Sequence, residues 1–156
     1  MTGVDSLTLM TGPPHWWLTK DGDRSCLEMY QRHYSARCYR DGRPRRLFVG
    51  PGEKIVLRTL HAEAMFVWRK CRSADAQPGV SCSVFRNEGY PVRSSLLIQQ
   101  ADAIADFCWP GERHYTYVNP QEIESRNPGY CFLCAGWRRC GVSAGGLLIL
   151  ERLPPK

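Results

Sequence analysis

The sequence predicts a three-layer α/β domain, in which a central mixed, mostly antiparallel sheet is flanked by helices. Strand-like and helix-like hydrophobic patterns alternate along the chain, which is typical of this fold class. The length of 156 residues, with 43% hydrophobic side chains, suits one domain with one core. Aromatic residues make up 11% of the chain, so a packed core is expected rather than disorder.

The N-terminal part is expected to be irregular. Residues 1–22 are rich in Gly, Pro and Thr, which predicts an irregular arm. Two tryptophans in this arm are expected to dock part of it on the rest of the protein. Residues 23–156 are expected to form a single domain. Ser25 and Glu28 have the spacing of a capping box, and apolar residues follow at helical spacing. The first helix is therefore expected to begin at Ser25 and to run to about His33.

Strands are expected where β-branched and aromatic residues are dense and turn residues bound the run. These segments are 54–60, 64–71, 80–86, 114–118, 137–140 and 147–152. The first two segments predict a hairpin, and the last two predict another around Gly141, Gly145 and Gly146.

Two further helices are expected in the second half of the chain. From Ser94 or the next residue to Cys108, apolar residues form one continuous helical stripe. The last helix is expected to begin with Asn127 as N-cap and Pro128 at the first helical position. It is expected to end at Gly136, because glycine is favoured after the last turn.

The net charge is +6 and the pI is near 9.0, and the basic residues are distributed unevenly along the chain. Between residues 32 and 46, six arginines accompany one acid, Asp41, and alternate with aromatic side chains. Guanidinium groups bind phosphate bidentately and aromatic rings stack on bases, so this segment predicts contact with nucleic acid. The alternative is a solvated loop that keeps the protein soluble.

The sequence predicts neither a membrane partner nor a metal site. No apolar run reaches the length of a membrane span, and the N-terminus lacks the pattern of a secretory signal, so a cytoplasmic location is expected. Reduced cysteines follow from that location. Cys131, Cys134 and Cys140 lack the second ligand pair of a zinc site. Four cysteines are expected to act as small buried hydrophobes: Cys71, Cys82, Cys108 and Cys131.

Residues 80–153 resemble the second half of the GNAT fold of N-acetyltransferases, in which a strand, a ligand-binding helix, a strand, a short helix and a terminal hairpin follow in that order. The sharpest part is 127–137, Asn-Pro-Gly-Tyr-Cys-Phe-Leu-Cys-Ala-Gly-Trp, which resembles the family's Asn-containing helix that ends in Gly-Phe or Gly-Trp. The resemblance covers about half of the chain. Where the family has the pyrophosphate loop Arg/Gln-x-x-Gly-x-Gly/Ala, residues 86–95 read Arg-Asn-Glu-Gly-Tyr-Pro-Val-Arg-Ser-Ser.

This divergent loop, the segment His33, Tyr34 and Ser35, and the basic segment beside it are similar to the phage-associated, Mom-type GNAT-like proteins that modify DNA bases. The resemblance implies transfer of an acyl or aminoacyl group to an amine of a base, which protects phage DNA from restriction. The donor implied is acyl-CoA or another acyl or aminoacyl carrier. One alternative is an acetyltransferase for a small-molecule or peptide amine. Another, which the missing Gly-x-Gly loop favours, is a non-enzymatic nucleic-acid-binding module.

Acyl transfer to an amine needs a base, stabilisation of the oxyanion and a proton for the leaving group. Glu88 follows a predicted buried strand directly and is the first candidate base; the alternative is a surface carboxylate paired with arginine. His33 is a second candidate, or a structural histidine at a helix end. The resemblance implies that the strand at 80–86 binds the acyl carbonyl and that Tyr130 protonates the leaving group; core packing is the alternative for Tyr130.

The candidate residues fall into three groups. The catalytic candidates are Glu88, Tyr130, His33, Tyr34 and Ser35. The donor-binding candidates, at the start of two predicted helices, are Arg93, Ser94, Ser95 and Asn127. The substrate-binding candidates are Arg86, Asn87, Arg37, Arg40, Arg43, Arg45 and Arg46.

Overall fold

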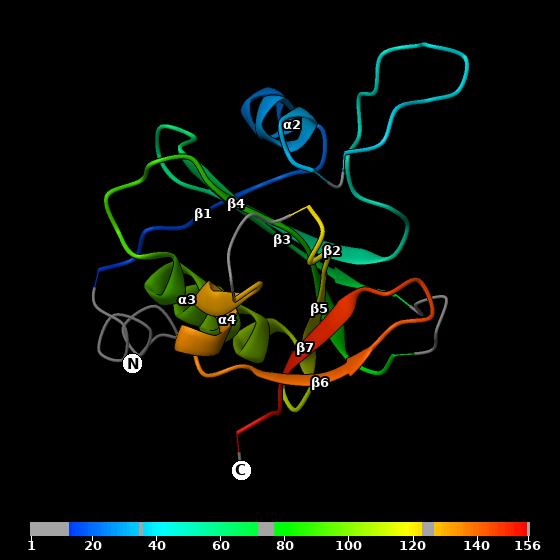
Figure 1. The fold of residues 1–156 in the computed structure, drawn as a ribbon. Helices are drawn as coiled ribbons and strands as arrows, with labels where there is room; N and C mark the ends of the chain where they lie inside the picture. Colours follow the sequence, from blue (N-terminus) through cyan, green and yellow to red (C-terminus); the bar gives the residue numbers. More distant parts are fainter. Residues whose placement is uncertain (1–12, 35, 72–76, 123–126, 156) are drawn as a thin grey trace.

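The computed structural model describes residues 13–34, 36–71, 77–122 and 127–155 (Figure 1). Within them, the chain forms a seven-stranded mixed sheet and three helices, which confirms the expected α/β class. Along the chain the elements are β1 (Trp17–Thr19), α2 (Arg24–Gln31), β2 (Glu53–Arg58), β3 (Ala64–Lys70), β4 (Val80–Asn87), α3 (Ser94–Cys108), β5 (His114–Val118), α4 (Tyr130–Cys134), β6 (Arg138–Val142) and β7 (Leu148–Arg152).

The strands lie in the order β1-β2-β3-β4-β5-β7-β6. Every neighbouring pair is antiparallel except β4 and β5, which run parallel. A parallel pair needs a crossover connection, and α3 supplies it here. The sheet is therefore mixed and mostly antiparallel, as the sequence predicts.

The parallel pair β4 and β5 is short. Residues 80–82 of β4 pair with 114–116 of β5, and beyond them β4 continues along β3 while β5 continues along β7. The pairing of β3 with β4 also shifts, because Val67 lies opposite Val84 and Trp68 opposite Cys82. Ser83 is therefore an extra residue in β4, a β-bulge that bends the strand where it leaves β5.

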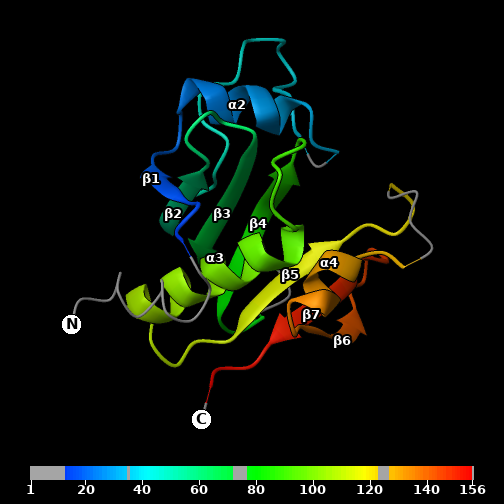
Figure 2. The same cartoon turned by 90° about the vertical axis from the view of Figure 1, so that its left-hand side faces the viewer.

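Two hydrophobic clusters pack against different strand residues. The larger cluster combines residues of α3 and α4 with Leu57, Phe66 and Trp68, and the smaller one combines residues of α2 with Val56 and Val67. Neighbouring strand residues thus point to different clusters, as the pleat of a sheet requires. Figures 1 and 2 show α2 separated from α3 and α4 by the strands.

The N-terminal arm contains a strand that the sequence does not predict. Trp17–Thr19 forms β1 along β2 at the edge of the sheet. Only one of the two tryptophans docks: Trp16 is buried and donates from Nε1 to the Leu97 carbonyl at 2.8 Å, whereas the Trp17 side chain is exposed. A three-residue edge strand is too short to show a periodic pattern, so its pairing depends on β2.

The predicted start of the first helix is wrong. Asp23 is the N-cap of α2, because its side chain accepts a hydrogen bond from the Cys26 backbone N–H at 3.0 Å, and the Ser25 hydroxyl donates to the same carboxylate at 2.5 Å. The helix ends at Gln31 rather than near His33. Ser25 therefore supports the cap instead of forming it.

The predicted cap of the last helix is also wrong. Gly129, with a φ of 80°, precedes α4, and the Asn127 carbonyl accepts from the Tyr130 N–H at 3.0 Å in a turn before the helix. A Cβ at position 129 would lie 2.5 Å from Cδ1 of Leu150. Both the left-handed backbone and this close approach favour glycine, so the chain cannot enter the helix at Asn127.

The cysteines are less buried than expected. All eight are unpaired, as the sequence predicts, but only Cys26 and Cys82 are buried. Cys108 is exposed at the end of α3, and Cys71 and Cys131 are half-buried.

In the described part of the chain, no helix combines the length and the apolar character needed to cross a membrane.

Candidate active site

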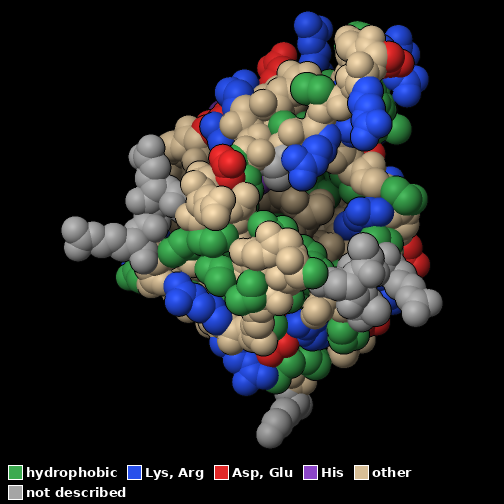
Figure 3. Space-filling view, turned by 45° about the vertical axis from the view of Figure 1, so that its right-hand side comes forward, with side chains coloured by type: hydrophobic (Ala, Val, Ile, Leu, Met, Phe, Trp, Pro, Cys, Tyr) green, Lys and Arg blue, Asp and Glu red, His purple; other side chains and the backbone are tan. Residues whose placement is uncertain are grey.

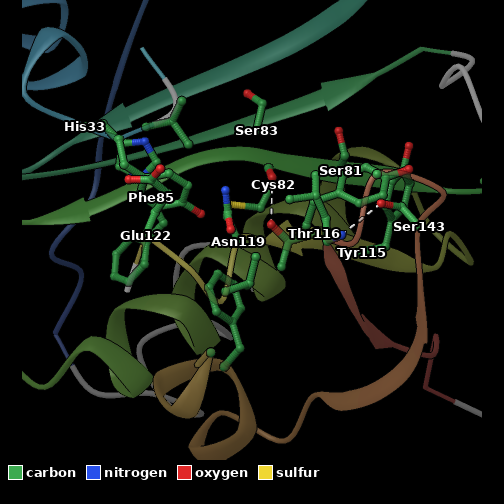
Figure 4. A pocket seen from close by; sticks show the side chains of 18 of the residues that line it. His33, Ser81, Cys82, Ser83, Phe85, Tyr115, Thr116, Asn119, Glu122 and Ser143 are labelled. Carbon is green, nitrogen blue, oxygen red and sulfur yellow. Dashed lines mark hydrogen bonds between the residues drawn. The ribbon is translucent and has the colours of Figure 1, made fainter. Parts of the chain in front are cut away.

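A pocket of about 1010 Å³ opens where β4 and β5 diverge (Figure 4). Its wall combines residues of the two strands with the start of α4, the turn before β7 and the segment after α2. Cys82 and Thr116 lie deep in this wall and are joined by a hydrogen bond of 2.9 Å from Thr116 Oγ1 to the Cys82 carbonyl. The space between the strands is therefore part of the pocket.

Positive charge surrounds this opening. Arg37 and Arg69 contribute to the pocket wall, and Glu122 is the one carboxylate among its described residues. Figure 3 shows a hollow near the centre of the visible face, with Lys and Arg side chains above it and to its right. The surroundings favour a ligand with negative charge.

His33 and Tyr34 line the pocket and connect its two sides. Their rings stack with centroids 4.4 Å apart and an interplanar angle of 29°. His33 forms a hydrogen bond with the backbone of Phe85 in β4, and Tyr34 forms one with the backbone of Asn119 after β5. The segment after α2 thus spans the opening between the diverging strands.

The surroundings of these two side chains set their protonation. Burial, together with the positive charge of Arg86, lowers the pKa of His33 to about 4, although its hydrogen bond to Phe85 acts in the opposite direction. Burial raises the pKa of Tyr34. Near neutral pH, His33 is therefore a neutral imidazole that can accept a proton, and Tyr34 keeps a hydroxyl proton that it can donate. Ser35 lies outside the described residues.

Tyr130 and Asn127 also line the pocket. The Tyr130 side chain is exposed, which differs from the core packing considered as its alternative, and a hydrogen bond with Cys134 raises its pKa. Oδ1 of Asn127 accepts a hydrogen bond from Arg139. Tyr130 is therefore a second protonated hydroxyl at the pocket.

Glu88 lies outside the pocket wall and is held between two arginines. Arg32 donates to both carboxylate oxygens at 2.6 and 2.8 Å, and Arg86 donates to Oε2 at 2.5 Å. The hydrogen bonds from Arg32 and Arg86 lower the pKa of Glu88 to about 2, against the effect of burial. This is the arginine-paired carboxylate of the alternative interpretation. A carboxylate so strongly stabilised as the anion is a weak proton acceptor.

Asn87 organises the loop between β4 and α3. Its Oδ1 accepts from the Tyr90 N–H at 2.8 Å, and its Nδ2 donates to the Val92 carbonyl at 3.4 Å and to the Ser94 hydroxyl at 3.2 Å. The candidates of this region lie outside the pocket wall: Arg86, Asn87, Arg93, Ser94 and Ser95.

The N-terminus of α3 is the part of this region that fits an anionic donor. Arg93 precedes the helix without a side-chain cap, so the first N–H groups of a 15-residue helix receive no capping hydrogen bond from it. Figure 2 shows that α3 begins beside α4, at the end of the sheet where β4 and β5 diverge. N–H groups at the start of a helix of this length can bind an anion.

Most of the predicted phosphate-binding arginines lie in residues 36–47, here called the arginine-rich loop. The guanidinium carbons of Arg43 and Arg45 lie 4.1 and 4.7 Å from the ring centroid of Tyr39. Arg45 also donates to the Arg37 carbonyl at 2.8 Å, so the loop has internal structure. Within the loop Arg37 alone reaches the pocket wall; the others lie outside it: Arg40, Arg43, Arg45 and Arg46.

Sequence reasoning missed much of the pocket wall. The missed polar residues are Arg69, Ser81, Ser83, Tyr115, Thr116, Tyr117, Asn119, Glu122 and Ser143. Ser81 and Ser83 alternate with apolar residues in a predicted strand, but this pattern does not identify a shared pocket. Their association depends on the parallel pairing of β4 and β5, a long-range contact without a local signal.

The cysteines near α4 do not form a metal centre. Cys131 contributes to the pocket wall, while Cys134 is exposed and bonds to Tyr130. Among the residues that the structure describes, no group of three or more His, Cys, Asp or Glu side chains is arranged to hold a metal ion.

Comparisons with protein-family models, with curated proteins and with solved structures gave no match for this chain. The pocket at the divergence of β4 and β5 and the charged groups around it are therefore the features that point to a function.

Proposed function

We propose that the protein is a GNAT-like N-acyltransferase that transfers an acyl or aminoacyl group to an amine of a nucleic-acid base. The observation that carries this proposal is the pocket where the parallel strands β4 and β5 diverge. In the family that residues 80–153 resemble, the strand before the ligand-binding helix leaves its neighbour and offers a backbone N–H to the acyl carbonyl. A three-layer arrangement, with α2 on one face of the sheet and α3 and α4 on the other, belongs to the same proposal.

The backbone of β4 is suited to hold the acyl group. Beyond Cys82, none of the described β5 residues pairs with β4, so backbone groups on that edge face the pocket instead of a strand. The bulge at Ser83 turns the strand at this point. Backbone N–H groups that are fixed before the reaction stabilise a developing oxyanion effectively, because they need no reorganisation.

The side chains at the pocket provide both proton transfers. The amine nitrogen attacks the carbonyl carbon of a thioester or ester donor, so a C–N bond forms and the C–S or C–O bond of the donor breaks. The amine loses one proton, for which we assign neutral His33 as the acceptor, because its pKa of about 4 makes it a stronger base than Glu88, whose pKa is about 2. The leaving thiolate or alkoxide gains one proton, for which the hydroxyls of Tyr34 and Tyr130 are the donors.

The acyl donor and the nucleic acid are assigned to different parts of this site. The N-terminus of α3, with Arg93, Ser94 and Ser95, is assigned to the phosphates of an acyl-CoA-type donor. The arginine-rich loop beside the opening is assigned to the phosphate backbone of the nucleic acid.

Mass spectrometry of nucleosides tests the proposal. DNA from cells that express the wild type is expected to contain a heavier nucleoside, whose added mass identifies the acyl group. Tyr34→Phe and Tyr130→Phe are expected to reduce its amount at least tenfold, because each removes a proton donor. Phe107→Ala is the control, since Phe107 is exposed on α3 outside the pocket wall. Unmodified DNA despite intact DNA binding would favour a small-molecule acceptor or a binding module.

A further inference from the structure

We infer that the target base enters the pocket extruded from its stack, and that the ring pair of His33 and Tyr34 is the surface on which it stacks. This inference rests on the proposed nucleic-acid substrate and specifies the state in which that substrate binds. The depth of the pocket, the position of the ring pair and the charged side chains of the wall support it.

The pocket reaches too deep into the sheet for a base inside a duplex to fill it. Cys82 and Thr116, which line the pocket, are each only 5% exposed and lie within the sheet. The diverging part of β4, which would hold the acyl carbonyl, begins directly after Cys82. Enzymes that modify a base at such depth take the nucleotide out of the helix or act on single strands, because stacking neighbours block access.

The ring pair lies at the pocket and remains accessible. Tyr34 is 39% exposed, and its ring is held parallel to His33 by a stacking contact and by the hydrogen bond with Asn119. His33 is fixed in turn by Phe85. A rigid aromatic surface of this kind stacks on a base of any sequence and replaces the contacts that the base loses on extrusion.

Charged and neutral polar side chains of the pocket wall suit the phosphates and the base of an extruded nucleotide. Arg37 and Arg69 line the pocket, and Nε of Arg69 donates to the Pro51 carbonyl at 2.7 Å, which fixes the side chain. Guanidinium groups so placed bind the phosphates on either side of an extruded nucleotide. The wall also carries neutral donors and acceptors, which suit the edge of a base: Ser81, Ser83, Thr116 and Asn119.

The inference predicts an order of affinities. Extrusion from a fully paired duplex opposes binding, whereas a mismatched or single-stranded base is extruded at little cost. The wild type is therefore expected to bind a duplex with one mismatch, and a single strand of the same length, about tenfold more tightly than the perfect duplex.

Fluorescence anisotropy with labelled DNA oligonucleotides at fixed salt, without any acyl donor, tests this order. Tyr34→Ala removes the ring and is expected to abolish the preference for the mismatch. Tyr34→Phe keeps the ring and is expected to retain the preference, although it loses the hydroxyl that acyl transfer requires. Phe107→Ala, outside the pocket, is expected to behave as the wild type. Circular dichroism of each variant establishes that it is folded.

The outcomes separate the inference from the proposed function. Equal affinities of the wild type for the three DNA forms would overturn extrusion and leave DNA modification standing. A mismatch preference that persists in Tyr34→Ala would overturn the role of the ring pair. Absence of binding to every DNA form would overturn the nucleic-acid substrate, and the inference with it.

Discussion

His114 occupies the centre of a buried polar network that supports one wall of the pocket. Its side chain is fully buried; Nδ1 lies 2.7 Å from Oδ1 of Asp102, and Nε2 lies 3.3 Å from Oδ1 of Asp106. The other oxygen of Asp102 accepts from Trp137 Nε1 at 2.9 Å, and Arg152 donates to Asp106 at 2.9 Å. These bonds connect α3 to β5 and β7, and β5 continues into the pocket.

Asp102→Ala is expected to lower the free energy of unfolding by about 3 to 5 kcal/mol, because it leaves a buried histidine and a buried indole N–H without their partner. Urea unfolding measures the change. Asp41→Ala is the matched control: it removes an acid whose ion pair with Arg43, at 3.4 Å, is exposed. Its expected effect is below about 0.5 kcal/mol. Similar losses in both variants would show that the network contributes little.

His33 is expected to make stability depend on pH in a defined direction. The folded imidazole has a pKa of about 4, against an ordinary value of 6.5, because burial and Arg86 disfavour its charged form. As the pH falls below about 6.5, the unfolded chain therefore binds a proton that the folded chain does not. The contribution of neutral His33 is complete above that pH and is lost as the pH falls toward 4.

The measurement is the difference in unfolding free energy between the wild type and His33→Gln, followed from pH 7 to pH 4. Groups other than His33 titrate in both proteins and cancel in the difference. The wild type is expected to lose stability relative to His33→Gln as the pH falls. A constant difference would show that the imidazole titrates normally in the folded protein.

At the scale of elements, the junction of β4 and β5 depends on Gly79. This residue has a φ of 110°, and a Cβ there would lie 2.1 Å from the Arg113 carbonyl oxygen. The same oxygen accepts from the Val80 N–H at 2.8 Å, which begins the parallel pairing. The close approach of the two backbones at this glycine therefore sets where the strands begin to pair.

Gly79→Ala is expected to destabilise the protein more than Gly89→Ala. Gly89 also has a positive φ, of 95°, but a Cβ there meets no atom within 4 Å. The backbone conformation alone accounts for about 1 to 2 kcal/mol at either position, and Gly79→Ala must in addition displace a backbone carbonyl. Thermal or urea unfolding of the two variants compares these effects. Equal losses would contradict the tight contact between the strands.

At the scale of elements, the sequence predicts the bounds of most strands and of α3, but not the caps of α2 and α4. Strands β2 to β5 and helix α3 begin and end within two residues of the predicted bounds, because hydrophobic patterns report them locally. The caps of α2 and α4 differ because the deciding contacts are not visible in a capping pattern. The Asp23 carboxylate also binds Arg58, 35 residues away, and Gly129 contacts Leu150 across the fold.

Among the candidate residues that the sequence predicts, several line the pocket and others lie outside it. The sequence predicts five residues that do line the pocket: His33, Tyr34, Arg37, Asn127 and Tyr130. Its position after a strand predicts Glu88 as well, but Arg32, 56 residues away in the sequence, binds that carboxylate. Sequence reports the chemistry of a side chain, whereas its orientation depends on contacts between distant residues.

At the scale of the whole molecule, positive charge is concentrated on one side of the pocket. The chain carries a net charge of +6, and Arg37 of the arginine-rich loop lies in the pocket wall, while the other arginines of this loop lie outside it. Figure 3 shows Lys and Arg side chains above the hollow and to its right, and others elsewhere on the visible face. Such a field attracts a polyanion before any specific contact forms, and it weakens as salt is added.

The affinity for DNA is therefore expected to fall steeply with salt, and the slope reports how many phosphates the protein contacts. The logarithm of the binding constant falls with the logarithm of salt concentration by about 0.9 for each phosphate contacted in duplex DNA. The double variant Arg43→Gln, Arg45→Gln is expected to reduce the slope by about 2, because it removes two guanidinium groups of the arginine-rich loop. Arg138→Gln, on the exposed edge strand β6, is expected to leave the slope unchanged.

Anisotropy titrations between low and moderate salt give the slope for each protein. A reduced slope in the double variant alone would place the phosphate backbone along the arginine-rich loop. Equal slopes in all three proteins would mean that this loop does not contact phosphate. Its arginines would then belong to a solvated loop that keeps the protein soluble, which is the alternative interpretation of the sequence. Because Arg43 and Arg45 both lie over the ring of Tyr39, Tyr39→Leu is also expected to reduce the slope if this contact positions them.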